Sequence, residues 1–403
     1  MSADFLDLMH LFSCGALGKE PNAKEYNINE ILRLSSEQGV FAVVFLSLEK
    51  LYNKKCLTIT EHDFAYLKSQ YTQAVFSSIR KNAAVNIAVQ QLKNSGFDCV
   101  MLKGQILSGL YAVPETRISG DTDLLLPSAG MEHLACQALE KIGFETIKRP
   151  DTSHHAMCKR ADAGLIELHL SLYDEIFEDL WFNNRGEKRE EYINITTKDG
   201  YTYKTLSYTD NAVFITLHAI KHFFSEGVGI RQIADMLLFN KTYKDEINWE
   251  KYNKLMEKLK FKKLVDHIYE IGRRYLDIDI CKTSDIDEKN IEDILYDIET
   301  GGLFGKEDKS RKDFYMEATK ERSQKDDSEY DEYIRQWKGN ISLKRKLFPP
   351  ESDMKKAYNI LNNHAYLLPV FWIVRLIKIF AGKIKPKKIN DKRLELLKNL
   401  DII

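Results

Sequence analysis

Two aspartates near the middle of the chain stand at a spacing that suits metal chemistry. Asp121 and Asp123 are two residues apart, and three leucines follow at 124–126. Side chains alternate along a strand, so both carboxylates are expected on one face of a strand that enters a sheet. Converging carboxylates repel each other unless a cation lies between them, and Mg²⁺ prefers such oxygen ligands. The pair predicts a divalent-metal site for phosphoryl or nucleotidyl transfer; the alternative is a turn, which the composition of residues 119–123 also suits.

A third carboxylate in the sequence can complete such a site. Glu167 lies within the mostly apolar stretch 165–172, an expected strand in which an unpaired carboxylate is unfavourable. His169 is two residues further on and shares its face. A two-metal transferase needs a third carboxylate for the ion that activates the nucleophile, and Glu167 is our candidate. The alternative is an ordinary ion pair with a lysine or arginine on a half-exposed strand.

Basic and glycine residues upstream are candidates for binding phosphate. Lys103 and Gly104 lie where an expected strand, 98–102, passes into an expected helix, 104–111. A helix N-terminus offers free N–H groups and partial positive charge to a phosphate. Arg117 is a candidate for neutralising a triphosphate or the leaving pyrophosphate. A structural glycine beside a solvated lysine, and an ordinary loop arginine, are the alternatives.

Two residue pairs further along the chain have the spacing of one helix face. His218 and His222 stand at i and i+4, which can bind zinc. Zinc peptidases place Glu directly after the first histidine, and here Ala219 stands there, so histidines that pack within their helix are the favoured interpretation. Arg231 and Asp235 have the same spacing, which predicts an ion pair along the helix.

Composition and charge restrict the class of protein. The 403 residues are 44% hydrophobic and 30% charged, with a formal net charge of −1. This neutral balance argues against a nucleic-acid polymerase, which needs a basic surface. Six scattered cysteines without a C-x-x-C pair indicate a reducing compartment. No signal-peptide pattern is present, and the most apolar window, 366–380, is too short and too charged to span a bilayer. We therefore expect a cytoplasmic protein.

Hydrophobic periodicity predicts an α+β protein with helical regions on both sides of the strands. An extended helix is expected over 66–93, ended by Gly96, and helices again over 210–224 and 230–241. Antiparallel pairs, 155–159 with 165–172 and 190–196 with 201–206, argue against a doubly wound sheet. The expected parts are a helical region over 1–95, an α/β core over 96–207, a helical domain over 208–300, a charged insertion or linker over 301–345, and a C-terminal helical segment over 346–403.

Several short motifs occur in order along the chain. They are Leu102-Lys-Gly104, Leu110-Tyr111, Arg117, Gly120-Asp-Thr-Asp-Leu-Leu-Leu126, Glu167-Leu-His169, His218, His222, Gly229-Ile-Arg231, Asp235, Leu347-Phe-Pro349, and Leu367-Leu-Pro369 with Arg375. This series resembles a largely uncharacterised bacterial nucleotidyltransferase family within the DNA polymerase β-like superfamily. The resemblance implies a small mixed β-sheet flanked by helices.

The resemblance also implies an activity, which is transfer of a nucleoside monophosphate from a nucleoside triphosphate, with ATP as the expected donor, and release of pyrophosphate. The acceptor would be a small molecule, a peptide or a protein. Two Mg²⁺ ions are expected, with Mn²⁺ as the alternative, on Asp121, Asp123 and Glu167. Phosphate and nucleotide contacts are expected from Lys103, Gly104, Arg117 and Gly120, and further site-lining side chains from His169, His218, His222 and Arg231. A catalytically silent module that binds nucleotide or a partner on the same fold is the alternative.

Overall fold

A computed structural model describes residues 1–126, 131–147, 155–169, 172, 191–225, 227–281, 283, 285–302, 368, 371–372 and 391–402. The chain divides into two compact units, Met1–Lys306 and Glu307–Ile403. The second unit includes helix α18 (Asp391–Asn399). Most of the expected charged insertion and C-terminal segment, with the motif at 347–349 and Arg375, lies outside the described residues. The five parts expected from the sequence stay predictions.

Three helices begin the first unit. They are α1 (Ala3–Leu17), α2 (Ile28–Glu37) and α3 (Phe41–Asn53). The Ser2 side chain accepts a hydrogen bond from Phe5 N at the start of α1, and Gly18 ends that helix in the left-handed conformation, with φ 72°. α1 crosses α3 so closely that a Cβ added at Gly15 would lie 2.1 Å from the Val43 carbonyl oxygen. The absence of a side chain at Gly15 therefore allows this helix crossing.

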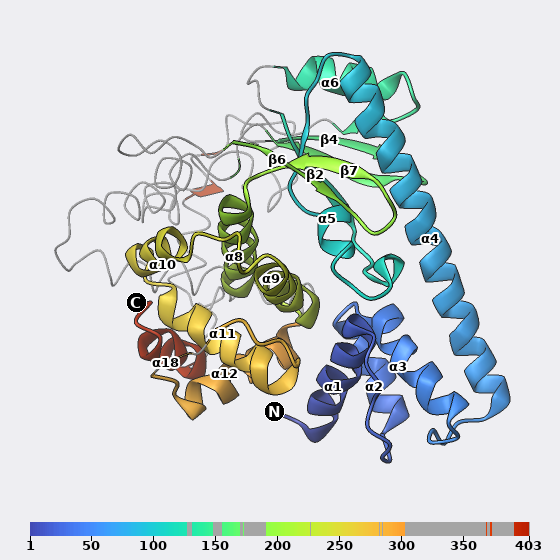
Figure 1. Cartoon of the computed structure of the whole chain (residues 1–403), viewed down its shortest axis with the longest axis vertical. Coiled ribbons are helices and arrows are strands. Elements are labelled where there is room, and N and C mark those ends of the chain that lie inside the picture. The colour runs from blue at the N-terminus through green and yellow to red at the C-terminus, as the bar shows by residue number, and fades with distance from the viewer. Residues whose placement is uncertain are drawn as a thin grey trace. The chain divides into compact units, whose positions relative to one another are not determined.

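A single long helix, α4 (Glu61–Asn94), follows and runs along one side of the first unit (Figure 1). Its 34 residues span about 51 Å. Thr60 caps its first turn, where the Thr60 hydroxyl accepts from Asp63 N, and Gly96 lies just past its end with φ 88°. Near its start, Phe64 stacks on Tyr52 of α3 with the ring centroids 3.6 Å apart. The extended helix expected from the sequence is confirmed, and it begins five residues earlier than expected, at Glu61.

The central sheet has five strands. They are β1 (Val100–Met101), β2 (Asp121–Leu125), β3 (Glu145–Ile147), β4 (His155–Arg160) and β5 (Gly164–His169). Their spatial order is β1-β2-β5-β4-β3. β2 and β5 are parallel, and the other neighbours are antiparallel. The expected α+β class with a small mixed sheet is confirmed.

Helices lie on both sides of this sheet (Figure 1). On one side, α6 (Glu132–Glu140) packs against β3 and β4, and Cys136 Sγ of α6 lies 3.3 Å from Cys158 Sγ of β4. On the other side are α8 (Tyr208–Ser225) and α9 (Ile230–Thr242). A separate hairpin, β6 (Ile193–Thr196) with β7 (Thr202–Thr205), joins the sheet through a hydrogen bond from the Thr205 hydroxyl to Met101 O. Both antiparallel pairs expected from the sequence are confirmed.

The segment after β1 differs from the expectation. In place of a helix over 104–111, α5 covers only Gln105–Ser108, and a 3₁₀ turn, η1, follows at Pro114–Thr116. Tertiary contacts end the helix early. Tyr111 is fully buried, and Ala112 N donates to Ala16 O of α1 at 2.8 Å. Leu110 N and Tyr111 N still bond within the local turn, but Ala112 N bonds to α1, so the helix does not continue.

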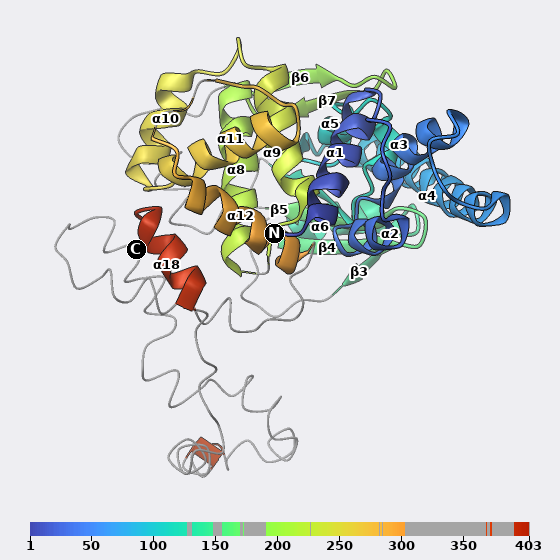
Figure 2. The same cartoon turned by 90° about the horizontal axis from the view of Figure 1, so that it is seen from below.

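Three more helices complete the described part of the first unit (Figure 2). They are α10 (Trp249–Lys258), α11 (Lys262–Tyr275) and α12 (Glu288–Gly301). The buried His267 of α11 connects two of them, because its Nδ1 lies 2.7 Å from Lys263 O and its Nε2 accepts from Asp287 N, the cap residue of α12, at 3.2 Å. Within the described residues, none of the helices has the length and apolar character needed to cross a membrane.

Candidate active site

Two neighbouring parallel strands carry the expected carboxylates. β2 and β5 pair so that Asp123 lies opposite Glu167 and Leu125 opposite His169. Opposed residues on paired strands extend from the same face of a sheet. Leu124, Ile166 and Leu168 point to the opposite face and are buried, so the polar side chains share one face of two strands whose other face lies in the core.

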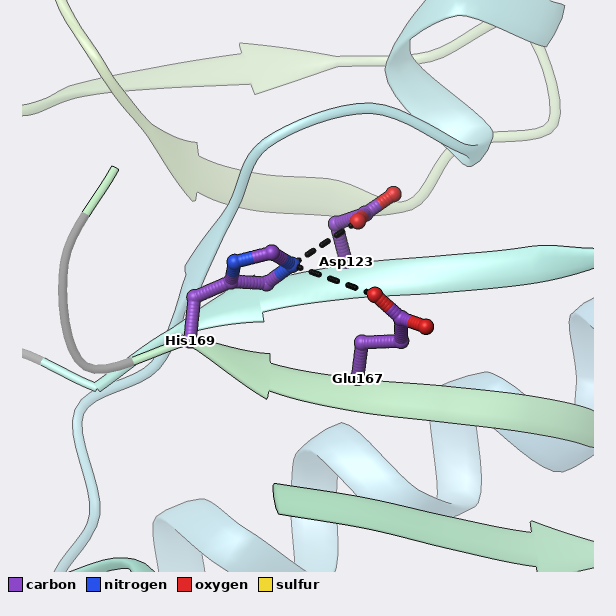
Figure 3. A group of neighbouring side chains, drawn as sticks. All are labelled: Asp123, Glu167 and His169. Carbon is purple, nitrogen blue, oxygen red and sulfur yellow. Dashed lines mark hydrogen bonds and ion pairs between the residues drawn. The ribbon is translucent and has the colours of Figure 1, made fainter. Parts of the chain in front are cut away.

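Asp123, Glu167 and His169 form one cluster (Figure 3). His169 Nε2 lies 2.9 Å from Asp123 Oδ1 and 3.7 Å from Glu167 Oε2. One ligand atom of each residue lies within 4.8 Å of the other two. The Asp123 side chain is 5% exposed, whereas those of Glu167 and His169 are 17% and 16% exposed. Two carboxylates and an imidazole in this arrangement are compatible with a divalent metal ion.

A lysine contacts the other oxygen of Asp123. Lys103 Nζ lies 2.9 Å from Asp123 Oδ2 and 2.7 Å from His218 Nε2. An ammonium group can only donate, so the His218 nitrogen accepts and its imidazole is neutral. Burial, and then the charge of Lys103, holds the pKa of His218 well below its usual value. Burial alone would raise the pKa of Asp123, but Lys103 and the His169 hydrogen bond lower it strongly overall.

The second histidine of α8 extends this polar network. His222 Nε2 lies 3.3 Å from His218 Nε2, and the two ring centroids are 4.5 Å apart. The i, i+4 spacing therefore places both rings together on one helix face, as expected. That face meets the sheet through Lys103, so the histidine pair borders the Asp123 cluster with the ammonium group between them.

The backbone around Gly104 places Lys103. Leu102 N donates to Asp123 O at 3.1 Å, which holds the end of β1 against β2. Gly104 then adopts φ 66° and ψ −113°, a conformation that strongly favours glycine. Because α5 is a single turn, it provides little helix dipole. The Lys103 ammonium is therefore the main positive charge that this segment brings to the carboxylates.

Arg117 is part of a buried ion pair. Its Nε and Nη2 donate to the two carboxylate oxygens of Asp235 in α9, each at 2.7 Å, and the Tyr111 hydroxyl donates to Asp235 Oδ1 at 2.9 Å. Burial alone would lower the pKa of Arg117, but the Asp235 charge raises it overall. The prediction of an ion pair between Arg231 and Asp235 is wrong, because Asp235 pairs with Arg117 instead.

Two further cations hold the loop before β2. Arg231 donates to Ile118 O. Lys81 of α4 donates to Ser119 O at 2.9 Å, to Ser119 Oγ at 3.2 Å and to Asp121 O at 3.1 Å. Burial is the largest influence on Lys81 and lowers its pKa to about 8. Sequence reasoning missed Lys81, since one lysine in a long helix carries no signal of a contact 40 residues away.

The residues expected in the site fall into two neighbouring groups. The first, the Asp123 cluster with its lysine, contains Lys103, Asp123, Glu167, His169, His218 and His222. The second contains Arg117, which also donates to Gly104 O at 3.3 Å, and Arg231, which holds the loop leading through Gly120 to Asp121. Asp121 is partly exposed at the start of β2, and its carboxylate does not belong to the compact ligand group of Asp123, Glu167 and His169.

The comparison with protein families decides the membership of the chain. Residues 24–277, more than half of the 403, match a family described as an uncharacterised nucleotidyltransferase. The chain belongs to this family. The matched region includes α4, both strands of the carboxylate site, and the two helices that carry His218 and Asp235. The family resemblance inferred from the motifs is confirmed. No curated protein and no solved structure matches the chain significantly.

Proposed function

We propose that this nucleotidyltransferase family member transfers a nucleoside monophosphate from a nucleoside triphosphate, with ATP as the expected donor, to an acceptor, and releases pyrophosphate. The observation that carries the proposal is the pairing of Asp123 and Glu167 on adjacent parallel strands, with His169 between their carboxylates. Such a cluster is electrostatically suited to a cation bound by phosphate groups as well as by protein.

The donor atoms fit a divalent ion. Asp123 and Glu167 offer the hard oxygen ligands that Mg²⁺ prefers, and the His169 nitrogen also suits Mn²⁺. Asp121, two residues before Asp123 on β2, is the proposed additional carboxylate for a second ion. A divalent ion bound here supplies positive charge to the triphosphate and lowers the pKa of an acceptor hydroxyl.

The remaining side chains have separate proposed roles. Lys103 can donate to a phosphate oxygen, because its ammonium already lies beside the carboxylates. Arg117 and Arg231 fix the loop before β2 and thereby the position of Asp121, so we assign both of them a positioning role. His218 accepts from Lys103 and keeps the lysine directed toward Asp123.

Calorimetry with each ribonucleoside triphosphate, with and without Mg²⁺ or Mn²⁺, tests the proposal. We expect metal-dependent binding of at least one nucleotide, lost in Asp123→Asn and Glu167→Gln. Asp98→Asn is the matched control, because the exposed Asp98 pairs with Lys204 on the protein surface. Transfer of a radiolabelled α-phosphate to components of a cell extract would then reveal the acceptor. Failure of every nucleotide to bind wild-type protein in the presence of metal would contradict the proposal.

One observation favours the alternative of a catalytically silent nucleotide-binding module. Asp123 already contacts the Lys103 ammonium and the His169 imidazole. A buried carboxylate without a metal ion requires partners of this kind to stabilise its charge. A silent module would bind nucleotide equally well after chelation of metal, and Asp123→Asn would leave that binding intact. The same calorimetry therefore separates the two functions.

A further inference from the structure

The Lys103 ammonium occupies one side of the carboxylate on which the proposed metal site depends. It lies 2.9 Å from Asp123 Oδ2, and both side chains are largely buried, at 12% and 5% exposed. Its other polar neighbour, His218, is a neutral acceptor at 2.7 Å. Within the described part of the chain, Lys103 therefore places a full positive charge in contact with Asp123 Oδ2. His169 forms a hydrogen bond with the other carboxylate oxygen, Oδ1.

A divalent ion and this ammonium would share the same small carboxylate. Protein oxygens bind Mg²⁺ at about 2.0–2.1 Å, so an ion on Asp123 would lie close to an ammonium that is 2.9 Å from that group. Like charges at such a separation repel strongly where little water screens them. The neutral His218 imidazole carries no negative charge that would offset this repulsion.

Donor phosphates offer the lysine a new partner. A lysine ammonium is a compact, mobile charge on a flexible stem and binds phosphate oxygens well. We propose that Lys103 is the resident counter-ion of Asp123, that it competes with the divalent ion for this carboxylate, and that the donor's phosphates take up the lysine when the ion binds. This inference rests on the proposed function and adds a coupling to it. Metal and nucleotide must bind cooperatively, because each favours the state in which Lys103 has left Asp123.

Metal binding in the absence of nucleotide tests the competition directly. Mn²⁺ binding, followed by electron paramagnetic resonance and calorimetry, is measured on wild type, Lys103→Met and the control Lys68→Met. Lys68 is an exposed lysine of α4 paired with Glu49, so its removal changes net charge by the same amount away from the site. We expect Lys103→Met to bind Mn²⁺ about tenfold more tightly than wild type, the size of an ordinary coupling between sites, and Lys68→Met to match wild type.

A second pair of measurements addresses the nucleotide. A non-hydrolysable triphosphate should tighten Mn²⁺ binding to wild type more than to Lys103→Met, because only wild type has a lysine to transfer. In wild-type protein, acylation of Lys103 by an amine-reactive ester, read by mass spectrometry, should accelerate when Mn²⁺ is added. This labelling experiment requires no variant, so it still tests whether Mn²⁺ displaces Lys103 from Asp123 if Lys103→Met does not fold.

The outcomes separate the two proposals. Equal or weaker Mn²⁺ binding by a folded Lys103→Met, or Lys103 acylation that Mn²⁺ leaves unchanged or slows, overturns the competition but leaves the metal site and the proposed function standing. Absence of Mn²⁺ binding in both wild type and Lys103→Met, with and without nucleotide, overturns the proposed function together with this inference.

Discussion

Removal of Asp235 should strongly destabilise the first unit, because it leaves the Arg117 guanidinium buried without a counter-charge. The two side chains are 5% and 6% exposed, and the carboxylate accepts two hydrogen bonds from Arg117 and one from Tyr111. Breaking a buried ion pair by deleting one partner costs about 3–5 kcal/mol. We expect Asp235→Ala to lie in the upper half of this range, since three hydrogen bonds disappear, one of them from the buried Tyr111 hydroxyl.

Urea denaturation followed by circular dichroism measures this effect, with Tyr111→Phe as a graded comparison. That variant removes a single hydrogen bond to a charged group and should cost about 1.5–3 kcal/mol. A double-mutant cycle with Arg117→Met and Asp235→Leu isolates the pair. The double variant should be much more stable than the sum of the single changes predicts, because neither charge then remains unpaired.

Two results would refute this reasoning. One is a loss of less than about 1 kcal/mol in Asp235→Ala, the level of an exposed ion pair. The other is strict additivity in the cycle, which would mean that the two side chains do not depend on each other.

Three further predictions concern other parts of the first unit. His267 is neutral in the fold, and burial lowers its pKa. As the pH falls below about 6.5, the unfolded chain therefore takes up a proton at this residue before the folded protein does, and the free energy of unfolding should decrease. His267→Gln should show a smaller loss of unfolding free energy between pH 7 and pH 5. Gly15→Ala should destabilise more than Gly272→Ala, as measured by thermal unfolding. The added Cβ would lie 2.1 Å from backbone Val43 O at Gly15, whereas at Gly272 its nearest neighbour is the rotatable Leu237 side chain and the backbone Ile278 O is 3.2 Å away. Lys81→Met should lower nucleotide turnover by loosening the loop that leads to Asp121, and Lys81→Arg should restore part of it; full activity in a folded Lys81→Met would rule out this positioning role.

The sequence was most informative where local pattern and chemistry coincide. Asp121, Asp123 and the leucines after them predicted one strand with both carboxylates on one face, and Glu167 predicted a second strand. The parallel pairing of β2 with β5 brings Asp123 and Glu167 together. The uninterrupted stretch without glycine or proline predicted α4. Such features depend on alternation and propensity within a few residues, which a single sequence displays directly.

Contacts between distant segments were beyond the sequence. The i, i+4 rule assigned Asp235 to Arg231, whereas packing of α9 against the loop before β2 gives it to Arg117, which is 118 positions away. The expected helix after Gly104 stops after one turn because Tyr111 and Ala112 bond to other elements. In each case a local preference worth a few tenths of a kcal/mol gives way to buried tertiary interactions that are several times larger.

The long helix α4 has a consequence for how this protein can be divided. Along its length it stacks on α3 through Phe64, donates from Lys81 to the loop before β2, and accepts at Asn86 from the Tyr203 hydroxyl of β7. A fragment that begins at the sheet, near residue 96, would lack this scaffold and expose the surfaces it covers. We therefore expect that a piece that folds independently and retains the carboxylate site must include α4 at least from Lys81 onward.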